Sequence, residues 1–239
     1  MKKKRILAML LAVTSCLSLA VSASAANTVN RKATDFRDFD KSAWYTEAVN
    51  AAVDNGLLYG KSATIIDPNG DMTRAEMAAI INRSFGCYAK ADISKYKDVS
   101  KDKWYFEDVA MAVQIGTYNG RSNTAMAPDS PITRQEAMTV VARALELDYD
   151  SYSKTDLSGF SDRSEISNWA LPYVRAMVGA DYIHGRGKIL APQDDITRAE
   201  FAQIFANIIK SYITAKGEYT KNHDGNLLVR CADVTLKDM

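Results

Sequence analysis

The 239-residue chain has few of the side chains that hold metals or carry redox chemistry. It contains three cysteines and two histidines, with neither a Cys-x-x-Cys nor a His-Glu-x-x-His pattern. Cys87 and Cys231 remain once an export signal is removed, and although two cysteines could pair, they make no disulfide framework. The acidic run at residues 67–71 is similar to the start of a calcium loop but lacks the later glycine and glutamate. We therefore expect no metal and no cofactor.

An excess of charge of one sign is lacking as well. The chain has 30 lysines and arginines against 29 aspartates and glutamates. Four of the basic residues and none of the acidic ones lie in residues 1–25, so the chain without this segment has a net charge of −3. There is no basic stripe or basic amphipathic helix, which argues against nucleic acid or a membrane surface as a partner.

The one long apolar run lies at the N-terminus. Four basic residues at positions 2–5 precede apolar or small residues from 6 to 21, and Ala23-Ser24-Ala25 is a small-x-small cleavage site. This order is typical of a secretory signal peptide, so we predict that residues 1–25 are removed and that the exported chain does not insert into a membrane. Lipidation of Cys16 is the alternative, because the residues before it are similar to a bacterial lipobox.

One five-residue pattern, apolar-Thr-Arg-Ala/Gln-Glu, occurs at residues 72–76, 132–136 and 196–200. A tryptophan lies 28 or 29 residues before each threonine, a glycine lies 16 residues after each tryptophan, and a proline lies five residues before each threonine. These landmarks are Trp44, Trp104 and Trp169, then Gly60, Gly120 and Gly185, then Pro68, Pro128 and Pro192. Landmarks held in register at this spacing predict a repeat architecture.

Each repeat contains two amphipathic helical patterns. The first spans about residues 44–55, 104–115 and 168–179, and the second begins at the Thr-Arg pattern. A short helix pair with one apolar stripe cannot bury that stripe alone, so the copies should share a core. We predict an all-α fold in which three tandem helix–loop–helix repeats pack as a pseudo-threefold bundle, in preference to three separate beads.

The threonine and glutamate of each copy have the spacing of a capping box, in which each satisfies a backbone N–H at the helix start. The capping box does not explain the arginines, which are Arg74, Arg134 and Arg198. A cation in the first turn faces the positive end of the helix dipole. We favour an external anion, held by the guanidinium and the helix N-terminal amides, as its partner. An aspartate of a neighbouring repeat is the alternative.

A second cation follows each landmark glycine, at Lys61, Arg121 and Arg186. It could complete an anion site, or it could be a solvated loop charge. The three tryptophans would suit the flat apolar face of a sugar ring. Because large aromatic side chains more often fill cores, we favour a core anchor at the start of the first helix as their role.

The repeats open on Phe36-Arg37-Asp38, Tyr96-Lys97-Asp98 and Phe160-Ser161-Asp162. With the Trp-led helix, the glycine turn, the proline and the Thr-Arg-Ala-Glu helix start, the chain resembles the S-layer homology (SLH) family over residues 35–213. The resemblance implies a pseudo-threefold bundle whose grooves between neighbouring repeats bind a secondary cell-wall polysaccharide, in many members through a pyruvate ketal. The family arginine corresponds to Arg74, Arg134 and Arg198.

The third repeat departs from this pattern. Gly56 and Gly116 lie 12 residues after the tryptophan, where a helix C-cap is expected, but Asp181 occupies that place in the third copy. Aspartate adopts the left-handed conformation better than most residues, so the turn can form. Its carboxylate would repel an anionic ligand, which makes the groove formed with repeat three the doubtful one.

We place SLH repeats at residues 35–90, 95–148 and 159–214, followed by a short tail at 215–239. In the tail, residues 227–231 could form a single strand, for which the sequence shows no partner.

The predicted function is that of a non-catalytic, secreted protein that anchors at the cell wall and S-layer by binding an anionic polysaccharide. The expected glycan-binding residues are Arg74, Arg134, Arg198, Lys61, Arg121, Arg186, Trp44, Trp104, Trp169, Gly60, Gly120 and Gly185. Other exported or S-layer proteins are further candidate partners, and an exported protein–protein interaction module is the alternative function. A wall-polysaccharide enzyme is the least supported class, because the three motif glutamates already serve as caps.

Overall fold

The computed structural model describes residues 31–85, 88–220 and 225–237. The predicted signal peptide with Cys16, and also Cys87, lie outside these ranges. The chain divides into two compact units. We call Pro68–Phe201 the central unit, and Met1–Asp67 with Ala202–Met239 the terminal unit. This division cuts through the first and third repeats, so the units do not correspond to single repeats.

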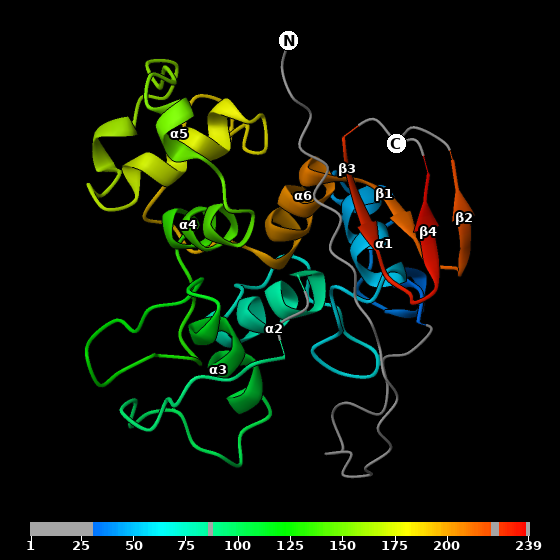
Figure 1. Cartoon of the computed structure of the whole chain (residues 1–239). Coiled ribbons are helices and arrows are strands. Elements are labelled where there is room, and N and C mark those ends of the chain that lie inside the picture. The colour runs from blue at the N-terminus through cyan, green and yellow to red at the C-terminus, as the bar shows by residue number, and fades with distance from the viewer. Residues whose placement is uncertain (1–30, 86–87, 221–224, 238–239) are drawn as a thin grey trace. The chain divides into compact units, whose positions relative to one another are not determined.

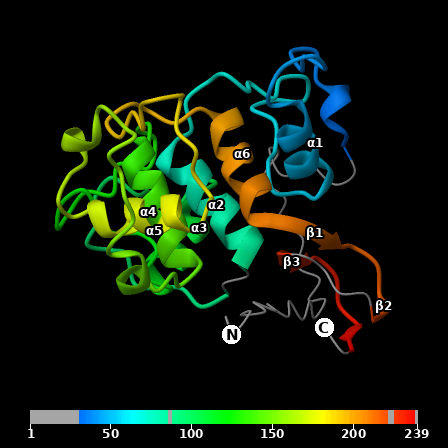
Figure 2. The same cartoon turned by 90° about the horizontal axis from the view of Figure 1, so that it is seen from above.

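The helices of the central unit pair between neighbouring repeats. The unit contains α2 (Arg74–Phe85), α3 (Phe106–Gln114), α4 (Arg134–Ala144), α5 (Leu171–Gly179) and the first residues of α6 (Arg198–Ile208) (Figure 1). α2 packs against α3, and α4 packs against α5 (Figure 2). The second helix of one repeat therefore buries its stripe against the first helix of the next. The core residues of these helices include Met77, Ile81, Val109, Met138 and Val141.

The three Thr-Arg motifs meet through their backbones in the central unit. The amide of Met72 donates to the carbonyl of Ile196 (2.9 Å), that of Ile196 to Ile132 (3.0 Å), and that of Ile132 to Met72 (3.0 Å). Each residue thus donates to one motif copy and accepts from the other, and all three side chains are fully buried. These bonds bring together three segments that are far apart in the sequence.

An aspartate from each repeat opening fastens the loop that leads to the motif helix. Asp98 accepts from the amides of Met126 (2.9 Å) and Ala127 (2.6 Å). Ala127 has a positive φ of 54°, which is unusual for a residue with a side chain, so the carboxylate stabilises a strained turn. Asp38 and Asp162 accept from the corresponding amides of their own repeats.

The terminal unit contains α1 (Thr46–Asp54), which buries the face that its periodicity predicts. The buried residues of this helix are Ala48, Val49, Ala52 and Val53. α1 begins two residues after Trp44. None of the helices in the described ranges is long and apolar enough to cross a bilayer.

The expectation of an all-α fold is wrong for the C-terminal part of the chain. Within the described residues, α6 is followed by four short strands: β1 (Ile209–Ile213), β2 (Gly217–Tyr219), β3 (Asn226–Val229) and β4 (Val234–Leu236). β1 pairs with β3 and β2 pairs with β4, both in parallel (Figure 1). The predicted lone strand in the tail therefore has a partner, the segment directly after the last helix. Ile213 and Val229 are opposite each other in this pair and both are buried.

Candidate functional site

The threonine and glutamate of each motif form the predicted capping box. In α4, the amide of Glu136 donates to Oγ1 of Thr133 (3.4 Å), and the amide of Thr133 donates to Oε2 of Glu136 (3.0 Å). The same two bonds form in the other two copies, at 3.0–3.2 Å. The predicted helix starts are thus confirmed, and the other carboxylate oxygen of each glutamate pairs with an arginine.

The sequence suggested that the helix N-terminal amides bind an external anion. In the structure they bind backbone carbonyls of the protein instead. At α2, the amides of Arg74 and Ala75 donate to the carbonyls of Ser130 (3.0 Å) and Pro128 (2.9 Å) in the loop of the second repeat. The starts of α4 and α6 donate in the same way to carbonyls of residues 194 and 192, and of residues 70 and 68. The landmark proline of one repeat therefore accepts from the helix start of another, which satisfies amides that a helix leaves unpaired.

The motif arginines are buried and form a cycle of ion pairs with the motif glutamates. Nη1 of Arg74 lies 3.5 Å from Oε1 of Glu136, Nη1 of Arg134 lies 3.1 Å from Glu200, and Nη1 of Arg198 lies 3.1 Å from Glu76. The three arginines are 4%, 5% and 2% exposed. Of the two partners that the sequence left open, the structure shows an internal one, and it is a glutamate of the same motif instead of an aspartate.

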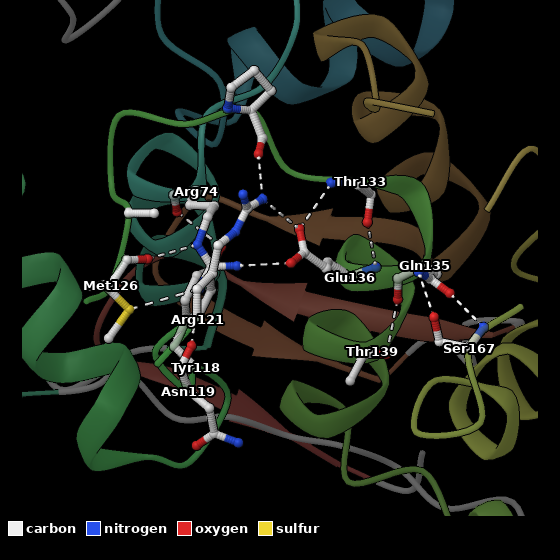
Figure 3. A network of polar contacts seen from close by, with 12 residues as sticks. Arg74, Tyr118, Asn119, Arg121, Met126, Thr133, Gln135, Glu136, Thr139 and Ser167 are labelled. Atoms are coloured by element: carbon white, nitrogen blue, oxygen red, sulfur yellow. Dashed lines mark hydrogen bonds and ion pairs between the residues drawn. The ribbon is translucent and has the colours of Figure 1, made fainter. Parts of the chain in front are cut away.

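Arg74 also holds the loop of the second repeat (Figure 3). Its Nε donates to the carbonyl of Met126 and its Nη2 to the carbonyl of Asn119, both at 2.9 Å. The guanidinium lies 5.2 Å from the ring centre of Tyr118, whose hydroxyl donates to the carbonyl of Arg74. Burial raises the pKa of Tyr118 well above its ordinary value. Arg74 therefore fixes the residue directly before Gly120 and the loop cation Arg121.

The loop cations reach the same glutamates. Nη2 of Arg121 lies 3.3 Å from Oε2 of Glu136 and donates to the carbonyl of Pro131 (3.1 Å) (Figure 3). In the third repeat, Nε and Nη2 of Arg186 contact the two carboxylate oxygens of Glu200, at 2.6 and 3.0 Å. The side chains of Arg121 and Arg186 are 43% and 36% exposed, so both remain accessible to a ligand. Lys61, in the terminal unit, is exposed too.

The pKa of Glu200 reflects this double pairing. Burial disfavours its charged form, but hydrogen bonds from Arg186 and the charge of Arg134 outweigh burial, so the pKa lies below the ordinary value. Burial in turn lowers the pKa of Arg134, against the opposing effect of Glu200. A general acid in glycoside hydrolysis needs a raised pKa. Glu200 has the opposite shift, and its chemistry is that of a fixed anion.

The tryptophans are not core anchors, and the favoured interpretation was wrong. Trp44, Trp104 and Trp169 are 63%, 49% and 51% exposed. The residue that follows each of them is buried instead, and in the second repeat it is Tyr105, at 1% exposure. The turn before each helix points one of two adjacent side chains inward, and the tryptophan takes the outward place. An exposed tryptophan at the same position of every repeat is a candidate contact for a ligand with an apolar face.

The landmark glycines and the third-repeat aspartate occupy constrained backbone positions. A Cβ on Gly120 would lie 2.4 Å from Cε1 of Tyr96, and a Cβ on Gly60 or Gly185 would lie 2.4 or 2.8 Å from the opening ring of its own repeat. Asp181 has a φ of 64°, so the prediction that it takes the left-handed conformation is confirmed. Its carboxylate lies 3.0 Å from Nε2 of His184.

In the part of the chain that the structure describes, no group of three histidines, cysteines or carboxylates could hold a metal.

Comparison with known proteins agrees with this repeat structure. The family model of the S-layer homology domain matches residues 35–78, 95–138 and 159–202. A surface-layer 125 kDa protein of Lysinibacillus sphaericus is 35% identical over 184 residues, which are 75% of this chain and 15% of the relative. An endoglucanase of a Bacillus strain is 26% identical over 210 residues, 86% of this chain and 22% of the relative. A cellulosome-anchoring protein of Acetivibrio thermocellus is 27% identical over 153 residues, 60% of this chain and 33% of the relative.

The chain thus spans a third or less of the length of these curated relatives. Two of these relatives are named for the surface layer and for anchoring of the cellulosome. Because the three matched segments cover more than half of its residues, the chain belongs to the S-layer homology domain family, as a secreted protein of the cell surface.

Proposed function

We propose that this chain is a non-catalytic anchor that binds an anionic, pyruvylated secondary cell-wall polysaccharide at sites between neighbouring repeats of a pseudo-threefold bundle. The observation that carries the proposal is the exposure of Trp44, Trp104 and Trp169 at one equivalent position of each repeat. A tryptophan face can bury the C–H side of a pyranose, whereas exposure of that face to water gives no hydrophobic stabilisation.

The loop cation supplies the polar half of the proposed site. In the second repeat, Arg121 is 43% exposed, and only its Nη2 makes a contact that the structure records. A guanidinium can bind a carboxylate through two parallel hydrogen bonds, as a pyruvate ketal would offer. Lys61 and Arg186 have the corresponding role in the other repeats, beside Gly60 and Gly185.

The motif arginines support this site from within the protein. Arg74 holds the carbonyl of Asn119, next to Gly120 and Arg121, and Arg134 holds the carbonyl of Leu190 in the third loop (2.8 Å). We therefore keep Arg74, Arg134 and Arg198 in the proposed site as positioning residues. Their effect on binding would pass through the loop that carries the cation.

Binding to purified cell-wall sacculi, with and without their secondary polysaccharide, tests the proposal. Trp104→Ala should weaken binding about tenfold, because it removes a stacking surface worth ~1.4 kcal/mol. Ile115→Ala is the matched control, since Ile115 is a large apolar residue of similar exposure (41%) outside the proposed site. Binding that survives removal of the polysaccharide would contradict the proposal and favour a protein partner on the same surface.

A further inference from the structure

The second and third repeats differ at one position beside the loop cation. Gly70, Ser130 and Asp194 each lie three residues before the motif threonine, and the carbonyl of each accepts from the first amide of a motif helix in another repeat. The backbone is therefore equivalent in the three copies. The side chain is not, because the third copy alone carries a carboxylate there.

That carboxylate pairs with the loop cation of its own repeat. Oδ2 of Asp194 lies 2.7 Å from Nη1 of Arg186, while Nε and Nη2 of Arg186 contact Glu200. All three guanidinium nitrogens of Arg186 are thus directed at carboxylates of the protein. Hydrogen bonding to Glu200 and to Asp194 raises the pKa of Arg186, consistent with a strongly held cation.

The second repeat holds its cation less completely. Arg121 contacts a single carboxylate, Glu136, through one nitrogen, and Ser130 stands where the third repeat has Asp194. The charged groups in direct contact around Glu136 are Arg74 and Arg121, so the group has a net charge of +1.

Glu200 contacts Arg134 and Arg186, and Arg186 also contacts Asp194, so these four groups have a net charge of zero. A further aspartate lies near each group in an equivalent place. Asp195 pairs with Thr133 through the backbone and experiences the charge of Arg121, but no ion pair joins the two among the described residues. Asp71 pairs with Thr197 in the corresponding place.

We propose that Asp194 is a built-in counter-ion that competes with an anionic ligand for Arg186, so that the third-repeat site binds the wall polysaccharide more weakly than the second-repeat site. The inference rests on the proposed function, because it assumes that Arg121 and Arg186 face the same ligand. A ligand carboxylate at the third site must displace Asp194, whose side chain is 60% exposed and makes no other hydrogen bond or ion pair within the described residues. At the second site no such displacement is needed.

Exchange of this residue between the repeats tests the proposal. The measurement is the affinity of the exported chain for secondary polysaccharide released from purified sacculi, by titration calorimetry. In an Arg121→Ala background, Asp194→Ser should tighten binding about two- to fivefold, the range expected for an exposed ion pair. In an Arg186→Ala background, Ser130→Asp should weaken binding by a similar factor. Both effects should shrink in about 1 M salt, where the Debye length is ~3 Å.

Asparagine substitutions at residues 194 and 130 separate the effect of charge on affinity from the effect of side-chain shape. Asp194→Asn should behave like Asp194→Ser, and Ser130→Asn should leave the affinity unchanged. If Arg121→Ala weakens binding but the exchanges at 194 and 130 have no effect, the counter-ion role is refuted and the proposed function stands. If the unaltered chain does not bind the polysaccharide at all, the proposed function is refuted, and the inference with it.

Discussion

Arg134 is a cation kept out of water by the protein around it. Its Nε donates to the carbonyl of Leu190 and its Nη1 pairs with Glu200, and the side chain is 6% exposed. Taking a guanidinium out of water costs several kcal/mol, and the carboxylate and carbonyl offset that cost only while the geometry holds. Removing the arginine would leave the buried carbonyl of Leu190 without its donor and the half-buried carboxylate of Glu200 with one cation fewer.

Arg134→Ala should therefore lower the free energy of unfolding by about 3 kcal/mol. The loss is placed at the lower end of the range for buried pairs, because Arg186 still contacts Glu200. Urea denaturation followed by circular dichroism measures it. Arg163→Ala, at an exposed arginine, is the control and should change stability by less than ~0.5 kcal/mol. Unchanged stability together with lost wall binding would restore direct ligand contact as the role of Arg134.

The sequence around Arg134 gave no sign of this burial. From the helix dipole alone, an arginine in the first turn contributes little to folding. Its partners Leu190 and Glu200 lie more than 50 residues further along the chain, so no local sequence pattern predicts these contacts. The exposure of Trp104 could not be predicted from the local sequence for the same reason. Which of Trp104 and Tyr105 faces the core depends on the packing around them.

The loop before each motif helix is built on a glycine that touches an aromatic ring. A Cβ on Gly120 would lie 2.4 Å from Cε1 of Tyr96 and 2.6 Å from the carbonyl oxygen of Ser122. The ring has some freedom to move, but the carbonyl belongs to the loop itself and does not. The ring and the glycine therefore fit each other, which accounts for their joint recurrence in the three repeats.

Gly120→Ala should destabilise the protein by about 1–3 kcal/mol, the usual cost of overpacking. Gly159→Ala is the matched control, because a Cβ there would have no atom within 4 Å. The control should change stability by less than ~0.5 kcal/mol. Thermal denaturation of the two variants compares them, and equal melting temperatures would show that the loop adapts to a side chain at residue 120.

Helix starts were predictable, whereas the strands were not. A capping box is complete within four residues, so Thr133 and Glu136 alone predict the start of α4. The left-handed turn at Asp181 is local in the same sense. β1 begins at Ile209, directly after α6, where one more isoleucine fits a helical stripe as well as a strand. Its pairing with β3 joins segments about 16 residues apart, which no periodicity reveals.

The second repeat depends on its neighbours on both sides. Its helix α3 packs against α2 of the first repeat, and α4 packs against α5 of the third. Its motif arginine pairs with a glutamate of the third repeat, and its motif glutamate pairs with Arg74 of the first. The backbone bonds of Ile132 go to Met72 and Ile196. The backbone bonds and the arginine–glutamate pairs of the motif are therefore made between repeats, whereas its capping box is internal.

A fragment of residues 95–148, the second repeat alone, should accordingly fail to fold. It would expose the apolar faces of α3 and α4, and it would leave the first amides of α4 without the carbonyls of Pro192 and Asp194. Isolated helices of 9 and 11 residues are unstable in water, so the fragment should show weak helicity and no sharp thermal transition by circular dichroism. Residues 26–239 serve as the reference and should melt cooperatively. A fragment with native-like helicity and a sharp transition would show that a repeat folds by itself, and that the cycle of arginine–glutamate pairs is an addition to the fold instead of a requirement for it.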